Sequence, residues 1–309
     1  MQQGHLKIWQ VSDGKPGHAK QATALIEALA GLRKIQHAVL PPWPLTKVLT
    51  TLLRPRGSGS QQQSGLVIGV GHGTHPTVLA LQRQLGARSA IIMNPSLPAR
   101  LFDVVITPFH DGFQPGGNRL VTPLSLAPVP KFSNPDYRRG LILLGGKSRH
   151  FEWDNEDVLQ QMSTLAERYP AVQWQATTSR RTPAALVAAA DVLPASIKLL
   201  DWTALPSDWL QHSLPEAGHI WITEDSASML AEAMNTQACV GLIKLTDTQK
   251  KNKLRRGTGA LEAKGQLATL ERPYAMSEDV EAVPADRACG QRENPNIVCA
   301  QSLLAMLDL

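Results

Sequence analysis

Two segments of this sequence, one near its start and one near its middle, show the same order of strand, glycine turn and helix. Residues 5–11 (His-Leu-Lys-Ile-Trp-Gln-Val) predict a strand, and residues 12–18 (Ser-Asp-Gly-Lys-Pro-Gly-His) predict a turn. Residues 19–30 then carry apolar side chains at helical spacing. The run 141–144 is likewise followed by Gly-Gly-Lys-Ser-Arg-His at 145–150 and then by a helical pattern. A strand that feeds a helix through a tight turn is the unit of a parallel sheet. The repetition therefore predicts two α/β domains.

The rest of the chain fits two Rossmann-like domains that face each other across a cleft. Its 309 residues are long for one hydrophobic core, and apolar runs alternate with helical patterns through both halves. A proline-rich stretch at 123–135 predicts the linker between domains over 1–125 and 138–290. Ligands of such sheets bind beyond the carboxyl ends of the strands. The turns that follow the predicted strands are therefore the candidate sites.

Composition narrows the classes of partner. Apolar residues make up 43% of the chain, as in ordinary globular proteins, and the net charge is +5. The positive charge suggests an anionic ligand or surface, but no arginine-rich arm predicts a nucleic-acid binder. The sequence shows no signal-peptide core and no apolar stretch of about 18 residues. We therefore expect a cytoplasmic protein, and the three cysteines show no metal-binding spacing.

Three of the turns predict an anion site in the second domain. Gly145, Gly146, Lys147 and Ser148 offer backbone amides and a cation to a diphosphate, although an ordinary basic loop has the same composition. In the turn 177–183, Arg180 and its neighbour Arg181 lie at a predicted helix start, where a bound anion would relieve their repulsion with the dipole. The third turn predicts phosphate contacts from Ser226 and Ser228 and a ribose contact from Glu232, or simple helix capping with a solvated glutamate.

One turn of the first domain is rich in glycine and histidine. The segment Gly69-Val70-Gly71-His72-Gly73-Thr74-His75-Pro76 follows a predicted strand. His72 and His75 could shape an acceptor pocket and move protons near neutral pH. A glycine-rich turn with surface histidines explains the same residues.

Five blocks together resemble the mitochondrial fission Elm-type family and, more broadly, GT-B glycosyltransferases. They lie at 12–18, 108–111 (Pro-Phe-His-Asp), 145–154, 177–183 and 223–229 (Thr-Glu-Asp-Ser-Ala-Ser-Met). The resemblance is to a bacterial member of the family and covers about 9 to 275. It implies a GT-B-like fold, in which a C-terminal helix, here 295–309, returns to pack on the N-terminal domain. Plant members are recruiters of a dynamin-like fission protein, so the resemblance by itself leaves activity open.

The GT-B resemblance implies a role for each motif. His18 resembles the histidine beside the acceptor in the glycosyltransferase that adds N-acetylglucosamine to lipid-linked muramyl peptide. It is therefore our general-base candidate, with Asp13 orienting or replacing it. Gly17 and the histidines 72, 75 and 110 would lie on the acceptor side. Arg180 would stabilise the leaving group, as a metal does in other transferases, and no Asp-x-Asp motif predicts a metal.

These expectations describe a metal-independent glycosyltransferase that needs no cofactor. Its substrate would be a nucleoside-diphosphate sugar, and its acceptor a cell-envelope glycan or lipid. Such an acceptor would bring the protein to the inner face of the membrane as a peripheral protein. Two other functions stay open: a non-catalytic scaffold or recruitment protein with the same fold, and a nucleotide-sugar 2-epimerase that uses the same donor site.

Overall fold

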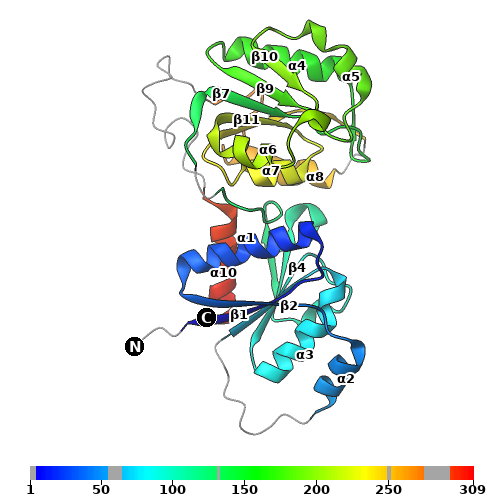
Figure 1. The fold of residues 1–309 in the computed structure, drawn as a ribbon, viewed down its shortest axis with the longest axis vertical. Coiled ribbons are helices and arrows are strands. Elements are labelled where there is room, and N and C mark those ends of the chain that lie inside the picture. The colour runs from blue at the N-terminus through cyan, green and yellow to red at the C-terminus, as the bar shows by residue number, and fades with distance from the viewer. Residues whose placement is uncertain (1–4, 55–64, 131–132, 249–251, 275–292) are drawn as a thin grey trace. The chain divides into compact units, whose positions relative to one another are not determined.

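The structure is a computed structural model that describes residues 5–54, 65–130, 133–248, 252–274 and 293–309 (Figure 1). The chain divides into two compact units. Unit 1 consists of Met1–Pro128 together with Glu293–Leu309, and unit 2 consists of Val129–Arg292. The final helix thus belongs to the same unit as the N-terminal half.

Unit 1 is built on a six-stranded parallel sheet in the order β2-β1-β3-β4-β5-β6. Every strand except β2 and β6 is largely buried, because helices cover both faces of a parallel sheet. The strands are β1 (Leu6–Val11), β2 (Ile35–Leu40), β3 (Gly65–Val70), β4 (Arg88–Ile92), β5 (Val104–Pro108) and β6 (Arg119–Thr122).

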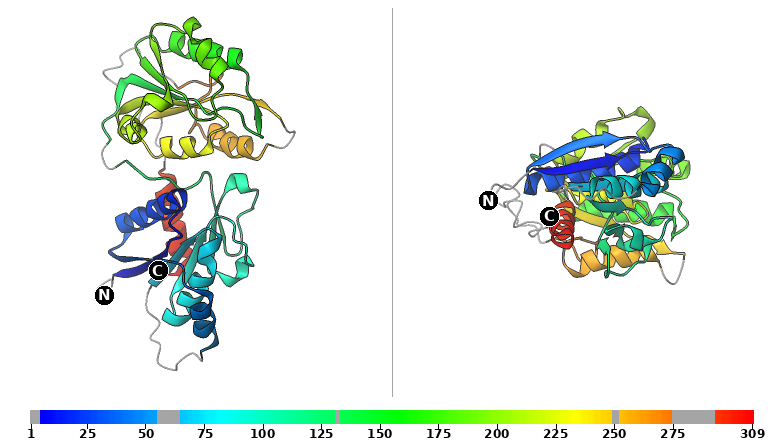
Figure 2. Two further views of the ribbon diagram at one scale, coloured as in Figure 1. Left: turned by 45° about the vertical axis from the view of Figure 1, so that its right-hand side comes forward. Right: turned by 90° about the horizontal axis from the view of Figure 1, so that it is seen from below.

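Two helices far apart in the sequence cover one face of this sheet. Helix α1 (Pro16–Leu32) and the C-terminal helix α10 (Pro295–Leu307) pack side by side (Figures 1 and 2) and share one core with alternate residues of the strands. Helix α3 (His75–Leu85) packs on the opposite face, where the intervening strand residues point. Helix α2 (Leu45–Leu53) lies outside α3 as a further layer.

Unit 2 is built on a five-stranded parallel sheet in the order β10-β9-β7-β11-β12. Its main core lies between this sheet and helix α4, with Trp174 and Trp221 among its largest buried side chains. Helix α4 begins where the Asp154 carboxylate accepts hydrogen bonds from the Glu156 and Asp157 amides. The strands are β7 (Asp136–Leu143), β9 (Gln173–Thr177), β10 (Ile197–Leu200), β11 (Ala217–Thr223) and β12 (Cys239–Ile243).

Five helices and a short ribbon complete the described part of unit 2. The ribbon pairs β8 (Phe151–Glu152) with β13 (Thr246–Asp247), so it ties the chain after β7 to the chain after β12. The helices are α4 (Asn155–Arg168), α5 (Ala184–Ala188), α6 (Trp209–Ser213), α7 (Ala227–Ala233) and α8 (Lys253–Ala263).

The predicted fold class, α/β with Rossmann-like parallel sheets, is confirmed. In each sheet the strand order reverses at one point: between β1 and β3 in unit 1, and between β7 and β11 in unit 2. At such a point the connections leave toward opposite faces, and a crevice opens outside the carboxyl ends of the two strands. The turns at 12–18 and 71–75 meet at the first reversal, and those at 145–150 and 224–226 meet at the second.

The helices of the described residues are too short or too polar to span a bilayer.

Truncation of one buried leucine tests the place of α10 in the core of unit 1. Leu303 is fully buried against the sheet, whereas Met306 on the same helix is 40% exposed. We expect Leu303→Ala to lower the free energy of unfolding by about 2–5 kcal/mol, because it removes buried methyl groups and leaves a cavity. Urea denaturation measures the change. Met306→Ala is the control and should cost well under half as much; equal costs would contradict this packing.

Candidate functional site

Asp13 and His18 form a paired carboxylate and imidazole at the strand reversal of unit 1. Asp13 follows β1, and His18 lies in the first turn of α1, which begins at Pro16. The His18 Nδ1 atom lies 3.0 Å from Asp13 Oδ2 and 3.1 Å from Oδ1. The two side chains are 20% and 12% exposed. The structure therefore brings together the two residues that the sequence nominated for catalysis.

The loop after β3 packs against the side chains of Asp13 and His18. Gly71 has a φ of +82°, and a Cβ added there would lie 2.3 Å from His18 Cε1. At Gly73 the nearest atom to an added Cβ is Asp13 Cβ, at 4.0 Å. The imidazole thus packs directly on the backbone of Gly71, and only glycine supplies both that space and that backbone conformation.

The surroundings of the pair suit a general base. Burial alone would raise the pKa of Asp13, but the hydrogen bond from the Lys15 amide, the contact with His18 and the Lys15 charge outweigh it, so the pKa lies below its usual value. An ionised Asp13 holds a proton on Nδ1 of the neutral ring and leaves Nε2 as the acceptor. His18 Nε2 has no hydrogen-bond partner among the described residues.

The other predicted acceptor-side residues divide by their exposure. His72 is exposed at the mouth of the same loop, and His110 is half-buried after β5, where its Nε2 lies 3.9 Å from Asp111 Oδ1. Gly17 is exposed in α1, and a side chain would meet nothing within 4 Å there. The position of Gly17 therefore does not require a glycine.

His75 requires a correction, because it is a core residue and not a proton carrier. Its ring is 1% exposed and packs edge-on against His72 and Phe102, while Nδ1 lies 3.3 Å from Ser96 Oγ. Burial, assisted by the charge of His72, lowers the pKa of His75 to about 4. The neutral, enclosed ring cannot exchange protons with a substrate near pH 7.

In unit 2 the glycine turn after β7 is tightly bound to two other loops. The Gly145 amide donates to Thr223 Oγ1 at 2.7 Å, the Gly146 amide to Asp225 Oδ2 at 3.0 Å, and the Lys147 amide to the Arg181 carbonyl at 3.3 Å. The amides of three of the four residues that were predicted to hold a diphosphate thus have acceptors within the protein. A Cβ at Gly146, whose φ is +151°, would lie 2.0 Å from the Arg181 carbonyl oxygen.

Asp225 occupies the position that was predicted for an external anion. Its side chain is completely buried, and Arg181 Nη1 lies 2.6 Å from its Oδ2 atom. Its other oxygen, Oδ1, is buried without a hydrogen-bond partner among the described residues. Burial raises the pKa of Asp225 despite the Arg181 charge and the Gly146 amide. Sequence reasoning missed this ion pair: it considered phosphate contacts or helix capping for the third turn, and it assigned a role to Arg180 and none to Arg181.

A second buried carboxylate, that of Glu224, lies next to Asp225 in the turn after β11. Glu224 is buried, and its two oxygens lie 3.1 Å from Lys244 Nζ and 2.6 Å from Arg255 Nη2. Arg255 also pairs with Asp247, at 2.8 Å. Lys244 pairs in turn with Glu262 of α8. This network joins the ends of β11 and β12 to α8, so the backbone that carries Asp225 is held from both sides.

The remaining predicted donor-side residues differ in their solvent exposure and in the contacts that they already make within the protein. Lys147 and Arg180 are exposed, and the side chain of neither has an ion-pair partner within the described residues. The Ser148 hydroxyl accepts from the amides of His150 and Phe151, so it also shapes its own turn. Along α7, Ser226 is buried, Ser228 is exposed, and Glu232, one turn after Ser228, is half-buried.

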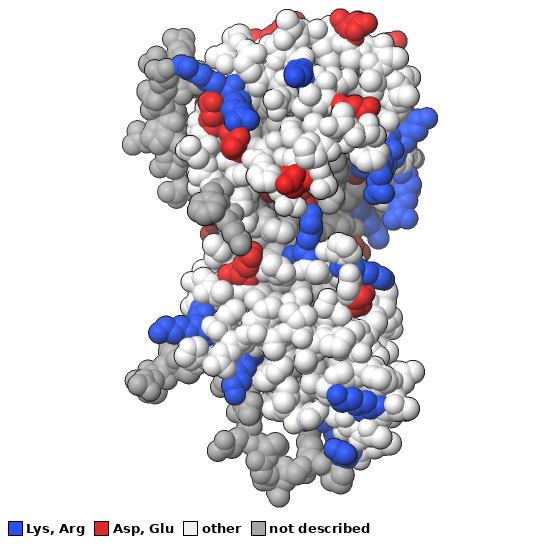
Figure 3. All heavy atoms as spheres, in the orientation of Figure 1, with Lys and Arg blue, Asp and Glu red and all other residues white. Residues whose placement is uncertain are grey.

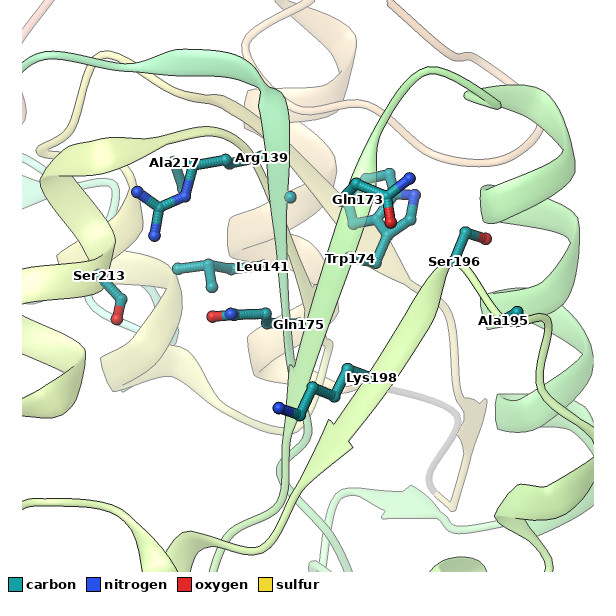
Figure 4. A pocket seen from close by; sticks show the side chains of 11 residues that line it. Arg139, Leu141, Gln173, Trp174, Gln175, Ala195, Ser196, Lys198, Ser213 and Ala217 are labelled. Atoms are coloured by element: carbon teal, nitrogen blue, oxygen red, sulfur yellow. The ribbon is translucent and has the colours of Figure 1, made fainter.

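A cavity of about 350 Å³ opens elsewhere in unit 2, at the amino ends of the strands (Figure 4). Arg139, Leu141, Gln175, Lys198 and Ser213 are among the side chains that line it. The sequence motifs lie at the opposite edge of the sheet, so this cavity is separate from the predicted donor site. Among the described residues, no three His, Cys, Asp or Glu side chains are grouped as metal ligands.

The buried His75 gives the stability of unit 1 a predictable pH dependence. The folded protein holds His75 neutral down to about pH 4, whereas the unfolded chain binds its proton near pH 6.5. The unfolded state therefore gains protons first, and we expect the free energy of unfolding to fall by up to about 3 kcal/mol between pH 6.5 and 4. Denaturant titrations of His75→Gln should show a flatter profile. The exposed-residue control His212→Gln should keep the wild-type slope, and an unchanged slope in His75→Gln would contradict the assignment.

Comparison with known proteins places the chain in a family. The family model described as mitochondrial fission ELM1 matches residues 16–290. The structure is similar to MurG of Acinetobacter baumannii (15% identity, 98% of this chain and 99% of that one, TM-score 0.43). It is also similar to a putative UDP-N-acetylglucosamine 2-epimerase of Listeria monocytogenes (14%, 98% and 95%, TM-score 0.49). A comparison with the curated proteins found no match. The extent of the family match shows that this chain belongs to the mitochondrial fission ELM1 family.

Proposed function

We propose that this protein binds a nucleoside-diphosphate sugar in unit 2 and transfers the sugar to a hydroxyl of a cell-envelope glycan or lipid. Unit 2 supplies the donor site, and unit 1 supplies the general base. The observation that carries the catalytic part is the pairing of Asp13 with His18, because it prepares an imidazole with one nitrogen held and the other available.

The donor site is assigned to the carboxyl ends of β7, β9 and β11. Three loops converge there, and they present Lys147 and Arg180 to solvent beside the ion pair of Arg181 with the buried Asp225. Figure 3 shows Lys and Arg atoms gathered on one side of unit 2. A diphosphate is the ligand that such a cluster of cations favours. Ser226 and Ser228 would add hydroxyl contacts, and Glu232 would accept from the ribose.

In the proposed transfer step, His18, Asp13 and Arg180 each have one role. His18 Nε2 would take the proton of the acceptor hydroxyl as its oxygen attacks the anomeric carbon, and the bond from that carbon to the diphosphate oxygen would break. Ionised Asp13 would stabilise the imidazolium that forms. Arg180 would stabilise the charge that develops on the departing diphosphate.

One observation favours a non-catalytic scaffold instead. The amides of Gly145, Gly146 and Lys147 are already occupied within the protein, and the carboxylate of Asp225 takes the place of a ligand anion. If this arrangement is permanent, the turn stabilises the fold and binds no diphosphate. Binding and turnover measurements separate these two functions.

Removal of one cation tests the donor site. We expect UDP to bind the wild-type protein in isothermal titration calorimetry, and Arg180→Ala to weaken that binding about tenfold or more, because a charge-assisted hydrogen bond is lost. Lys198→Ala is the matched control, since it removes a cation of the same sheet at its opposite edge. Equal losses in both variants, or no binding of any nucleoside diphosphate, would remove the support for this site.

Replacement of the histidine tests the base. With a UDP-sugar that the protein turns over, we expect His18→Ala to lower kcat by about 10²-fold or more and to leave the Kd for UDP unchanged. The measurement is release of UDP with and without an added acceptor. Full activity of His18→Ala would show that another group is the base. Release of an epimerised UDP-sugar without acceptor would indicate the 2-epimerase reaction in place of transfer.

A further inference from the structure

Helix α2 of unit 1 exposes an apolar stripe. Leu45, Leu49 and Leu53 are 69%, 56% and 81% exposed, whereas Val48 of the same helix is buried. Residues four apart lie on one side of a helix, so the three leucines form one continuous strip along its whole length. Single exposed leucines are common in proteins, but three in line on one short helix are a patch that a partner surface would cover.

The charges around this stripe are all of one sign. The sequence contains no Asp or Glu between Glu27 and Asp103, a stretch that holds eight Lys and Arg residues and includes the whole of α2. Lys47 lies on the other side of α2 from the leucines, and Arg54 directly follows the last residue of the helix. In Figure 3, the end of unit 1 that carries α2 and α3 shows Lys and Arg but no acidic side chains. Any surface that fits both the leucines and the cations must be apolar and anionic.

The start of the helix carries a second membrane-interface feature. Trp43 lies two residues before Leu45, and Lys47 Nζ lies 3.8 Å from the centroid of its indole ring. The Trp43 amide donates to Thr77 Oγ1 of α3 at 2.7 Å, which holds the start of α2 against the body of the unit. A tryptophan beside a lysine, at the end of a leucine stripe, suits the boundary between lipid headgroups and acyl chains.

We infer that the exposed stripe of α2, formed by Leu45, Leu49 and Leu53, docks unit 1 on an anionic lipid surface, with the pair of Trp43 and Lys47 at the start of the helix. The leucines enter the acyl boundary, and the cations contact the headgroup phosphates. Strand β2 ends at Leu40, which pairs with Val11, two residues before Asp13. Helix α2 begins five residues after Leu40, so docking through α2 would bring lipid to the unit that carries the proposed base. The inference goes beyond sugar transfer and would stand without it.

Vesicle co-sedimentation tests the surface directly. We expect the full-length protein to bind vesicles of phosphatidylcholine with phosphatidylglycerol at low salt, and not vesicles of phosphatidylcholine alone. The combined variant Leu45→Ser, Leu49→Ser, Leu53→Ser should bind at least about tenfold more weakly, because the apolar contacts are lost. Raising the salt to about 0.5 M should release the wild-type protein, since screening weakens the contact of the cations with the headgroups.

A matched control removes apolar side chains that are exposed elsewhere. Val192 and Leu101 are 70% and 43% exposed, and Val192→Ser with Leu101→Ser should leave vesicle binding unchanged. Because the substituted leucines face solvent, the melting temperature of the α2 variant should stay within a few degrees of wild type, which shows an intact fold. The Kd for UDP, measured on the same variant, should not change, so failure of the donor site and failure of this surface are distinguishable.

Three outcomes would overturn the inference. The first is no binding to anionic vesicles at low salt. The second is equal binding by the wild-type protein and the α2 variant. The third is a dimer of the wild-type protein, seen by analytical ultracentrifugation without lipid, that the α2 variant abolishes, because a second copy of the chain would then be the occupant of the stripe.

Discussion

The buried carboxylate of Asp225 holds the site of unit 2 together. It accepts from the Gly146 amide and pairs with Arg181, so it joins the loops that follow β7, β9 and β11. Loss of either partner would leave a buried charge without compensation, at a cost of about 3–5 kcal/mol. Gly145 is required by this contact, because a Cβ there would lie 2.2 Å from Asp225 Oδ2, whereas a Cβ at Gly146 would meet the Arg181 carbonyl.

Unit 1 places its carboxylate differently, although its sheet reverses in the same way. Asp13 is partly exposed and pairs with an imidazole, and its pKa is lowered, whereas the fully buried Asp225 has a raised pKa. The carboxylate at the strand reversal follows β1 in unit 1, where it pairs with an imidazole, and β11 in unit 2, where it forms an ion pair with Arg181. The proposal of a base in unit 1 and an anion site in unit 2 rests on this difference.

Local sequence patterns were most informative where one face of an element is buried. The helix predicted to follow the turn at 145–150 begins at Asn155, because Asp154 caps it and apolar residues recur at helical spacing. The strand β2 was missed because it lies at the sheet edge and most of its residues are exposed, so its sequence shows no buried face. Helix α8 was missed because its sequence is polar, although Asn252 caps it by accepting from the amides of Leu254 and Arg255.

By itself, the sequence determined the α/β class, the repeated strand-turn-helix unit and the short-range pairing of Asp13 with His18, because each depends on residues close together in the chain. The tertiary structure decided which distant groups meet. It brought Gly71 against His18, buried His75 in the core, and gave Arg181 to Asp225 in place of Arg180. These contacts depend on strand order and on loop conformation. The side chains of two neighbouring arginines in a loop point in different directions, and hydrophobic periodicity does not show which of them meets Asp225.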